Sequence, residues 1–359
     1  KLSVSLLLGL DVGTTSIKAV VNRPDGIAVA SAAAATPTHV PRPRWAYYRA
    51  DELWATVVDV IRRAVAEIAD PTQIVSVAVA SVAEAGVLLD AAGEATVDVI
   101  AWYDTRTRPQ SDWLGEYVGA DALFARTGLS LQPIFSLCKM LWYREHEPEA
   151  WRRSVHWLLI DEYIAFKLSG ERGSEPSQAS RTMLMNLHDL TWDQEILDKV
   201  EIEERMLPPL VSSGTRLGPV TARAAAETGL PQTALVATGG HDHVCGAFAA
   251  GVTRPGQMLN SLGTAEAVFL PTSAPLTDPK AGHQGYTQGA HVAGGGYYVF
   301  GGQYTSGACI DWIRRLLGDG SDPLAYDAAI AAAGRVPPGS NGVLFLPHLR
   351  MANPPFVDS

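Results

Sequence analysis

The sequence predicts an α/β protein, and three observations support this prediction. Apolar runs of strand length alternate with segments whose apolar residues recur every three or four positions, as in amphipathic helices. The 359 residues exceed what one small core accommodates, so two domains of ordinary size are expected. A strand, Gly-Thr turn, strand plan occurs twice, in "GLDVGTTSIKAVV" and "NSLGTAEAVFL". We therefore expect two related α/β domains, each presenting a Gly-Thr hairpin to one cleft.

The N-terminal part of the chain is predicted element by element. Residues 6–21 give two apolar strands joined by a tight turn, and the turn-rich "NRPDG" separates them from a strand over 27–35. Apolar residues at helical spacing predict a helix within 49–69. The β-branched run at 74–82 predicts a buried strand, and a hairpin-like segment follows at 86–96.

The middle of the chain, from about residue 112 to 207, is richer in helix signals. "FSLCKMLWYREHEPEAW" and "WDQEILDKV" carry apolar residues at three- and four-residue steps, so we expect a helical insertion there. Beyond Pro231 the strand and turn pattern returns in "TALVATGGHDHVCGAFAAGV" and "GQMLNSLGTAEAVFL".

Composition restricts the class of partner. A formal net charge of -10 argues against nucleic acid or an anionic membrane, which are bound mainly through Lys and Arg, so a small-molecule ligand is expected. Three cysteines with no CxxC or His-linked spacing suggest neither a disulfide framework nor a zinc site. No apolar run reaches the roughly 18–20 residues that span a bilayer. We expect a cytoplasmic protein.

The Gly-Thr-Thr turn after the first strand has the chemistry of a phosphate site. Glycine lets the backbone approach a ligand closely, while turn N–H groups and hydroxyls point outward as donors. Taken alone, such a turn is more often a plain hairpin. Asp11 favours the functional interpretation, because a carboxylate at the end of a buried strand needs a partner, and a hydrated magnesium ion beside phosphates supplies one.

At the level of motifs, the chain resembles the FGGY carbohydrate kinases. "GLDVGTTSIKAVV" and "NSLGTAEAVFL" look like the first and second phosphate motifs of that family. "ATGGHDHVCGAFAAGV" is similar to the segment with the catalytic aspartate, and "FGGQYTSGACIDWIRRLLG" to the Gly-Gly segment that meets the nucleotide. Shorter similarities, such as "AWYDTRT" and "GVLFLPHLRMANPPF", follow in the same order, so the resemblance is collinear over essentially the whole chain.

This resemblance implies a fold and its domains. The expected fold is α/β, with two actin-like (ribonuclease H-like) domains around a cleft. Residues 1–250 would form the sugar-binding kinase domain with the helical insertion, and 251–359 part of a nucleotide-binding domain. Family members continue well past "LPHLRMANPPFVDS", so the second domain is expected to be incomplete here and ATP affinity poor if the chain is whole.

The implied activity is ATP-dependent transfer of the γ-phosphate to a hydroxyl of a small ketose or polyol. Asp242 would accept the proton of the attacking hydroxyl. Asp11 would hold Mg²⁺, through water. The other residues that the resemblance assigns to ATP are Gly13, Thr14, Thr15, Lys18, Gly263, Thr264, Gly301 and Gly302.

The substrate residues follow from the same resemblance, with departures. Glu84 is the candidate hydroxyl-binding acid, and Trp102, Asp104 and Asp242 would line the sugar site, although a Trp at a strand end is as often a packing residue. The segment lacks the Met-His-Gly typical of xylulose kinases and has Ala83 where glycerol kinases have arginine. Glu175 replaces an aspartate common in the family.

Two histidines flank Asp242 in "GGHDH". The triplet resembles a metal-ligand set, but consecutive residues on a turn do not converge easily on one ion. We therefore expect His241 and His243 to flank or tune the base.

Two other functions remain open from the sequence. A non-catalytic sugar-binding protein would keep the polar cleft without a complete nucleotide site, and an actin-like or Hsp70-like ATPase would turn over ATP without sugar. The segment around Asp242 argues against the second. The sequence identifies neither the sugar nor the oligomeric state, for which a monomer or homodimer is expected.

Overall fold

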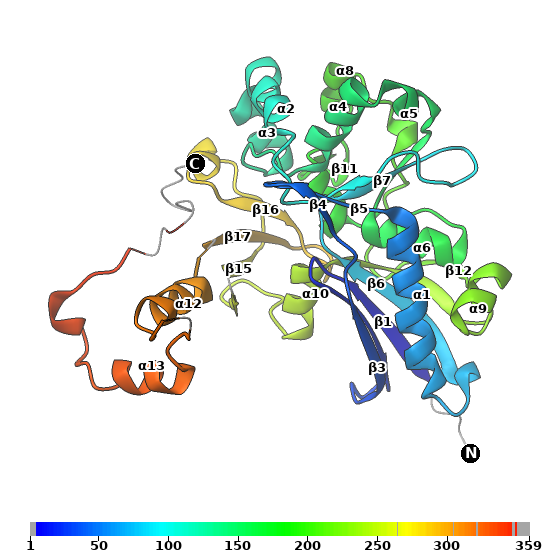
Figure 1. Ribbon diagram of the computed structural model, residues 1–359. Coiled ribbons are helices and arrows are strands. Elements are labelled where there is room, and N and C mark those ends of the chain that lie inside the picture. Colours follow the sequence, from blue (N-terminus) through cyan, green and yellow to red (C-terminus); the bar gives the residue numbers. More distant parts are fainter. Residues whose placement is uncertain (1–4, 264, 304, 321, 347–348, 350–359) are drawn as a thin grey trace.

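The chain forms a mixed α/β structure in which helices lie against two separate sheets (Figure 1). This computed structural model describes residues 5–263, 265–303, 305–320, 322–346 and 349. The predicted α/β class is therefore confirmed, and both Gly-Thr segments join antiparallel strands, β1 to β2 and β14 to β15.

The first sheet places three strand ends side by side. Its order is β12-β13-β6-β1-β2-β3, with β6 parallel to both β1 and β13. The register pairs Asp11 with Ala80, and His241 with Ser81, so the carboxyl ends of the three parallel strands meet at one edge. The strands are β1 (Leu6–Val12), β2 (Ser16–Asn22), β3 (Ala28–Ala35), β6 (Ile74–Ser81), β12 (Arg216–Pro219) and β13 (Leu235–His241).

Gly239 lets two of these strands approach closely. A Cβ at this position would lie 2.0 Å from the carbonyl oxygen of Val79 on β6, a distance that no side chain tolerates. A glycine here thus permits the pairing that brings Asp242 to the sheet edge.

Helices cover this sheet and form its core. In α1 (Ala50–Ala66), the buried residues Leu53, Val57, Ile61 and Ala64 recur at helical spacing and face the sheet. Together with α6 (Ile160–Ser169) and α9 (Ala222–Thr228), α1 belongs to one apolar cluster with the strands. The predicted helix at 49–69 and the strands at 27–35 and 74–82 thus lie where the sequence placed them, within a few residues.

The helix-rich middle forms a second core, at the upper end in Figure 1. It is not wholly separate from the first sheet, because α6 lies within residues 112–207 yet packs against β6 and β13. Besides α6, the middle of the chain contains α2 (Arg108–Leu114), the π-helical turn η2 (Gly115–Gly119), α3 (Ala120–Thr127), α4 (Ser136–His146), α5 (Pro148–Arg153), α7 (Pro176–Ala179), η3 (Ser180–Thr182), β10 (Met185–Asn186), β11 (Thr191–Trp192), α8 (Gln194–Val200) and η4 (Glu204–Met206).

Short strands and turns connect the sheet to this segment. β4, β5 and β8 form a three-stranded sheet, and β7 pairs antiparallel with β9. The segment predicted as a hairpin at 86–96 therefore forms one strand, β7. Its second half returns only as far as a single antiparallel β-bridge between Leu89 and Ala95. The bounds are β4 (His39–Arg42), β5 (Trp45–Tyr48), η1 (Pro71–Gln73), β7 (Gly86–Leu89), β8 (Val99–Ile100) and β9 (His156–Leu159).

The second sheet has the order β14-β15-β17-β16 and is antiparallel throughout. Its edge strand β16 contacts the first part of the molecule, since Ala290 donates its N–H to the Ser180 hydroxyl at 3.4 Å. No helix in the described part of the chain is long and apolar enough to cross a membrane. The helices and strands from residue 242 onward are α10 (Asp242–Ala249), β14 (Leu259–Leu262), β15 (Glu266–Thr272), α11 (Pro279–His283), β16 (Thr287–Ala290), β17 (Tyr297–Gln303), α12 (Gly307–Leu316), α13 (Tyr326–Ala333) and η5 (Ser340–Gly342).

Candidate active site

Two aspartates meet at the edge formed by the parallel strands. Asp11 is the penultimate residue of β1, and Asp242 follows β13 as the first residue of α10. Burial, together with the negative charge of Asp242, raises the pKa of Asp11, while Lys18 opposite it on β2 partly offsets this effect. No hydrogen bond to the Asp11 side chain occurs among the described residues, so its carboxylate is available to a cation with a preference for oxygen ligands, such as Mg²⁺.

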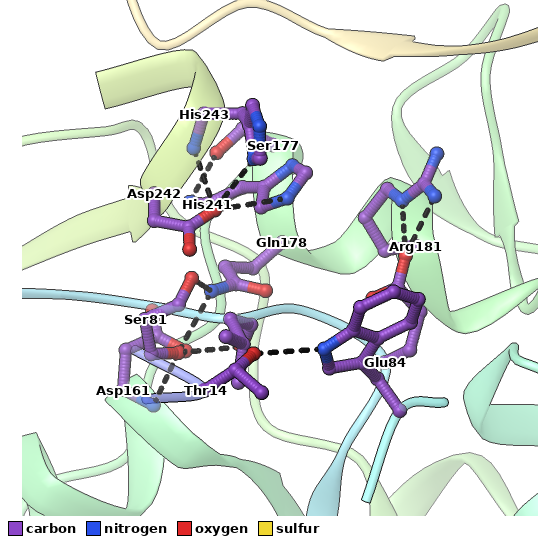
Figure 2. Close-up of polar contacts among 12 residues, drawn as sticks. Thr14, Ser81, Glu84, Asp161, Ser177, Gln178, Arg181, His241, Asp242 and His243 are labelled. Carbon is purple, nitrogen blue, oxygen red and sulfur yellow. Dashed lines mark hydrogen bonds and ion pairs between the residues drawn. The ribbon is translucent and has the colours of Figure 1, made fainter. Parts of the chain in front are cut away.

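The two oxygens of Asp242 have different surroundings. Oδ1 accepts the His243 backbone N–H at 2.6 Å and lies 3.2 Å from His243 Nδ1 and 3.3 Å from His241 Nε2. Oδ2 has no hydrogen-bond partner among the residues described, and in Figure 2 it points away from both histidines. One oxygen is therefore fixed and the other is free to accept a proton.

The histidines act on the ionisation of Asp242. Burial alone would raise the pKa of Asp242, but the His243 hydrogen bond and the charge of both imidazoles lower it below its ordinary value. The Asp242 hydrogen bond in turn raises the pKa of His243. Burial lowers the pKa of His241 to about 4, so this ring is neutral at pH 7. At neutral pH, Asp242 is an ionised carboxylate.

A chain of buried hydrogen bonds holds the end of β13. The His241 backbone N–H donates to the Ser177 hydroxyl at 3.0 Å, and that hydroxyl donates to Glu175. Glu175 is fully buried and accepts the N–H groups of Ser177 and Gln178 as the N-cap of α7. Gln178 extends the chain to β6 by donating to the Ser81 hydroxyl at 3.1 Å. Glu175, whose contribution the sequence left in doubt, thus helps to position the residue before Asp242.

Buried carboxyls lie behind this chain. Asp161 accepts a hydrogen bond from the Ser81 hydroxyl, and Glu162 accepts the Leu159 N–H at the N-terminus of α6. Burial raises the pKa of Glu162 to about 7 and the pKa of Asp161 well above its ordinary value, the latter also because Glu162 and Glu175 are negatively charged neighbours. Neither acid was singled out by the sequence.

Glu84 is bound by an arginine that the sequence analysis missed. Both are buried, and Arg181 approaches Glu84 Oε1 with Nη2 at 2.6 Å and Nε at 2.7 Å (Figure 2). Glu84 has a positive φ of 66°, and Ser136 donates to its carbonyl at 3.0 Å. Arg181 also reaches Thr287 of β16 at 3.4 Å. The sequence feature that could have drawn attention to Arg181 is its position as the single charged residue in "QASRTMLM", a segment of otherwise uncharged, mostly small or apolar residues.

Trp102 contacts the first Gly-Thr turn. Its indole N–H donates to the Thr14 hydroxyl at 2.9 Å, so the structure connects this predicted sugar-site residue to the predicted phosphate site. The neighbouring carbonyls of Gly13 and Thr15 accept hydrogen bonds from the Thr36 hydroxyl and N–H, which ties this turn to the segment after β3.

Asp104 is occupied by the protein itself. It is fully buried, accepts the Ala46 N–H at 2.6 Å, and forms a two-pronged ion pair with Arg106 at 2.8 Å and 3.0 Å. Arg106 lies over the Trp45 ring, with its guanidinium carbon 4.0 Å from the ring centre. These contacts place Asp104 in a supporting position within the loop that carries Trp102.

The second Gly-Thr turn and the Gly-Gly segment lie on the second sheet. The Gly263 N–H bonds the Ala265 carbonyl, and the Gly263 carbonyl accepts the N–H of Gly307 at the start of α12. Gly301 and Gly302 lie in β17, and a Cβ on Gly302 would stand 2.3 Å from the Glu266 carbonyl oxygen on β15. Thr264 lies outside the described residues. Strand pairing alone therefore accounts for Gly302.

Comparisons with known proteins agree with this geometry. Residues 6–249 match the N-terminal domain of the FGGY family of carbohydrate kinases. The chain is 30% identical to a glycerol kinase of Trichormus variabilis, over 99% of this chain and 71% of that protein. It is 27% identical to a xylulose kinase of Bacillus subtilis, over 98% of this chain and 70% of that protein.

Solved structures give the same result. A xylulose kinase from Rhodospirillum rubrum superimposes with a TM-score of 0.88 at 30% identity, over 96% of this chain and 70% of that one. A gluconate kinase from Lactobacillus acidophilus matches with a TM-score of 0.89 at 24% identity, over 97% and 69% of the two chains, and supports the fold alone. The expected actin-like α/β fold is confirmed, and the chain spans about 70% of the length of these relatives.

Proposed function

The chain belongs to the FGGY family of carbohydrate kinases, and we propose that it transfers the γ-phosphate of ATP to a hydroxyl of a small open-chain ketose or polyol. The observation that carries this proposal is Asp242, an ionised carboxylate with one oxygen hydrogen-bonded by His243 and close to His241, and with no partner for the other among the described residues. It lies beside Asp11 at the edge where strand ends meet.

Asp242 is the proposed proton acceptor. As the substrate hydroxyl attacks the γ-phosphorus, its O–H bond breaks and the proton moves to Asp242 Oδ2, while the bond from phosphorus to the bridging oxygen breaks and ADP leaves with that electron pair. Such a base contributes about 10²–10⁴-fold to a rate, and positioning with charge stabilisation contributes the larger share in phosphoryl transfer. The hydrogen bonds from His243 to Oδ1 keep the carboxylate ionised and aimed, and His241 Nε2 lies 3.3 Å from the same oxygen.

Asp11 is the proposed ligand of magnesium. Bound Mg²⁺ would neutralise charge on the phosphates during transfer. Asp11 presents oxygen ligands without hydrogen-bond partners among the described residues, and a divalent cation would offset the repulsion between Asp11 and Asp242 that raises the Asp11 pKa. Thr14 and Thr15 are the proposed phosphate donors, whereas the N–H groups of Gly13 and Gly263 are used within the turns by the Ser16 and Ala265 carbonyls.

Glu84 is the proposed hydroxyl acceptor for the sugar. Arg181 occupies Oε1 only, so Oε2 is left to accept a substrate hydroxyl. Trp102, hydrogen-bonded to Thr14 of the phosphate turn, is a second proposed sugar-site residue. The relatives are named for xylulose, glycerol and gluconate, which supports a small hydroxylated substrate without selecting one.

The direct test is ADP release from Mg-ATP across a panel of pentuloses, hexuloses and polyols, with the wild-type chain and Asp242→Asn. We expect turnover with one class of substrate and a loss of at least about 10²-fold in the variant. Asp51→Asn, on the exposed first turn of α1, is the matched control and should retain turnover.

The other outcomes separate the alternative functions. ADP release that is equal without sugar, or equal in Asp242→Asn, would favour a conformational ATPase. Sugar binding without turnover on any substrate would favour a non-catalytic sugar-binding protein. We also propose the cytoplasm as the compartment, consistent with three cysteines whose spacing suggests no disulfide framework, and a homodimer, which gel filtration with light scattering would test.

A further inference from the structure

His241, Asp242 and His243 form a compact set of metal-ligating atoms. One imidazole nitrogen from each histidine and one carboxylate oxygen all lie within 4.8 Å of one another. The consecutive residues converge because β13 ends at His241 and α10 begins at Asp242, so the chain turns sharply between them. In Figure 2 both rings are directed at the same oxygen of Asp242.

Of the three distances between the ligand atoms, the two that involve Asp242 Oδ1 suit a transition-metal ion. The distances from Asp242 Oδ1 to His241 Nε2 and His243 Nδ1 are 3.3 Å and 3.2 Å. A tetrahedral ion with bonds of about 2.0–2.1 Å needs neighbouring ligand atoms about 3.3–3.4 Å apart. The rings of His241 and His243 lie 5.7 Å apart, and the His243 side chain is 39% exposed, so rotation of this ring would close the third side.

Holding Asp242 for phosphoryl transfer uses the His243 hydrogen bonds and does not require a second histidine at position 241. The reaction needs a carboxylate that accepts a proton, and hydrogen bonds from backbone N–H groups would suffice to hold it. His241 is also not a fully hydrogen-bonded core histidine. Its Nδ1 is buried without a hydrogen-bond partner among the described residues, and its Nε2 lies 3.3 Å from Asp242 Oδ1.

We propose that His241, Asp242 and His243 bind a divalent transition-metal ion such as Zn²⁺, and that the bound ion reversibly inhibits the kinase. Imidazole nitrogens favour Zn²⁺, Ni²⁺ and Cu²⁺, whereas Mg²⁺ prefers sites made only of oxygen. The site therefore discriminates between cations: Asp11 takes the magnesium that the reaction uses, and the histidine pair takes a metal that stops it.

Inhibition follows from the ligand atom. A cation on Oδ1 withdraws electron density from the carboxylate, so Oδ2 becomes a poorer proton acceptor. The position of Asp242 at the first turn of α10 keeps the carboxylate in the ionised form that a metal requires. The inhibition part of the proposal rests on the proposed kinase activity, but metal binding does not.

The primary experiment measures Zn²⁺ binding by isothermal titration calorimetry on the wild-type chain, His241→Asn, His243→Asn and a control, His283→Asn. His283 is an exposed histidine paired with Asp121 on another surface. We expect one Zn²⁺ per wild-type chain, affinity at least tenfold weaker in His241→Asn and His243→Asn, unchanged affinity in His283→Asn, and no displacement by excess Mg²⁺. Equal affinity in all four proteins, or displacement by Mg²⁺, would overturn the site.

A second measurement does not depend on the variants folding. Paramagnetic Ni²⁺ added to the wild-type protein should broaden the imidazole NMR signals of His241 and His243 before those of His39 or His283. Broadening of the other histidines first would contradict the proposal.

The inhibition is tested separately, with the sugar substrate found by the panel. Zn²⁺ should inhibit wild-type turnover at the concentrations at which it binds, and at least tenfold more Zn²⁺ should be needed in His243→Asn. Zinc binding without turnover on any sugar would refute the kinase function and leave the metal site standing. Turnover that is insensitive to bound Zn²⁺ would refute the inhibition.

Discussion

The indole N–H of Trp102 donates to the hydroxyl of Thr14 at 2.9 Å, joining two residues 88 positions apart in the chain. Indole is a donor only, so the Thr14 oxygen must accept and its own proton is left for another partner. The contact therefore orients Thr14 as a donor toward the space where the phosphates of ATP are proposed to lie.

Trp102→Phe should weaken ATP binding more than sugar binding. The ring remains, but the hydrogen bond is lost, and a bond of about 1 kcal/mol corresponds to a change of about fivefold in affinity. ATP binding by calorimetry and KM for each substrate measure the effect. Trp113→Phe, at an exposed Trp of α2 stacked on Tyr117, is the control and should change neither constant. Equal loss for both substrates would show that Trp102 acts through packing alone.

Glu84→Gln should destabilise the protein because it leaves the Arg181 charge buried without its partner. Breaking a buried ion pair in this way typically costs about 3–5 kcal/mol. The double variant Glu84→Gln/Arg181→Met should recover much of that stability in urea unfolding, while sugar binding remains impaired. Glu149→Gln, which removes an exposed partner of Arg152, should leave the urea midpoint unchanged. A single variant as stable as the wild type would show that the ion pair is not buried in solution.

Because Glu162 has a raised pKa in the folded state, the free energy of unfolding should fall as the pH rises. The folded state raises the pKa of this carboxyl from 4.5 to about 7, so the folded protein binds the proton more tightly than the unfolded chain. Its stabilising contribution is fully present below pH 4.5 and is lost as the pH rises through about 7. Asp161 changes in the same direction.

Glu162→Gln tests this linkage. The amide stays neutral and its oxygen still accepts the Leu159 N–H, so urea unfolding between pH 5 and pH 8 should show a flatter dependence than in the wild type. The exposed Glu149→Gln should keep the wild-type slope. Parallel curves for wild type and Glu162→Gln would mean that Glu162 titrates normally.

Gly239→Ala should destabilise the first sheet, because its Cβ would lie 2.0 Å from the Val79 carbonyl oxygen. Overpacking of this kind costs about 1–3 kcal/mol or more, since two paired strands must separate. Gly246→Ala on α10 is the matched control: its Cβ would meet no atom within 4 Å, and alanine in a helix interior should stabilise by about 0.5–1 kcal/mol. Thermal melts of both variants measure the contrast.

Local elements were predictable from the sequence because they depend on neighbouring residues. The strand-turn-strand at 6–21 and the helix within 49–69 follow from apolar spacing and turn residues. The role of α6 in the first core was not predictable, because a helix-rich stretch does not reveal which sheet each helix covers.

The candidate site was predictable in its types of residue but not in its pairings. Glu84 and Asp242 were singled out from motifs, whereas Arg181, 97 residues after Glu84, is brought to it only by the tertiary fold. Asp104 looked available in sequence, yet Arg106, only two residues later, turns back and occupies it. Local sequence does not show where a long side chain is directed.

The order of strands in the first sheet has a consequence for synthesis on the ribosome. β6 is made early, but its parallel neighbour β13 begins 154 residues after β6 ends, at Leu235 following Ser81. Until then β6 has one unpaired edge, and such an edge recruits strands from other chains. We expect nascent chains that end before β13 to depend on chaperones that prevent aggregation. Asp11 and Asp242 should come together only after about two thirds of these 359 residues have emerged.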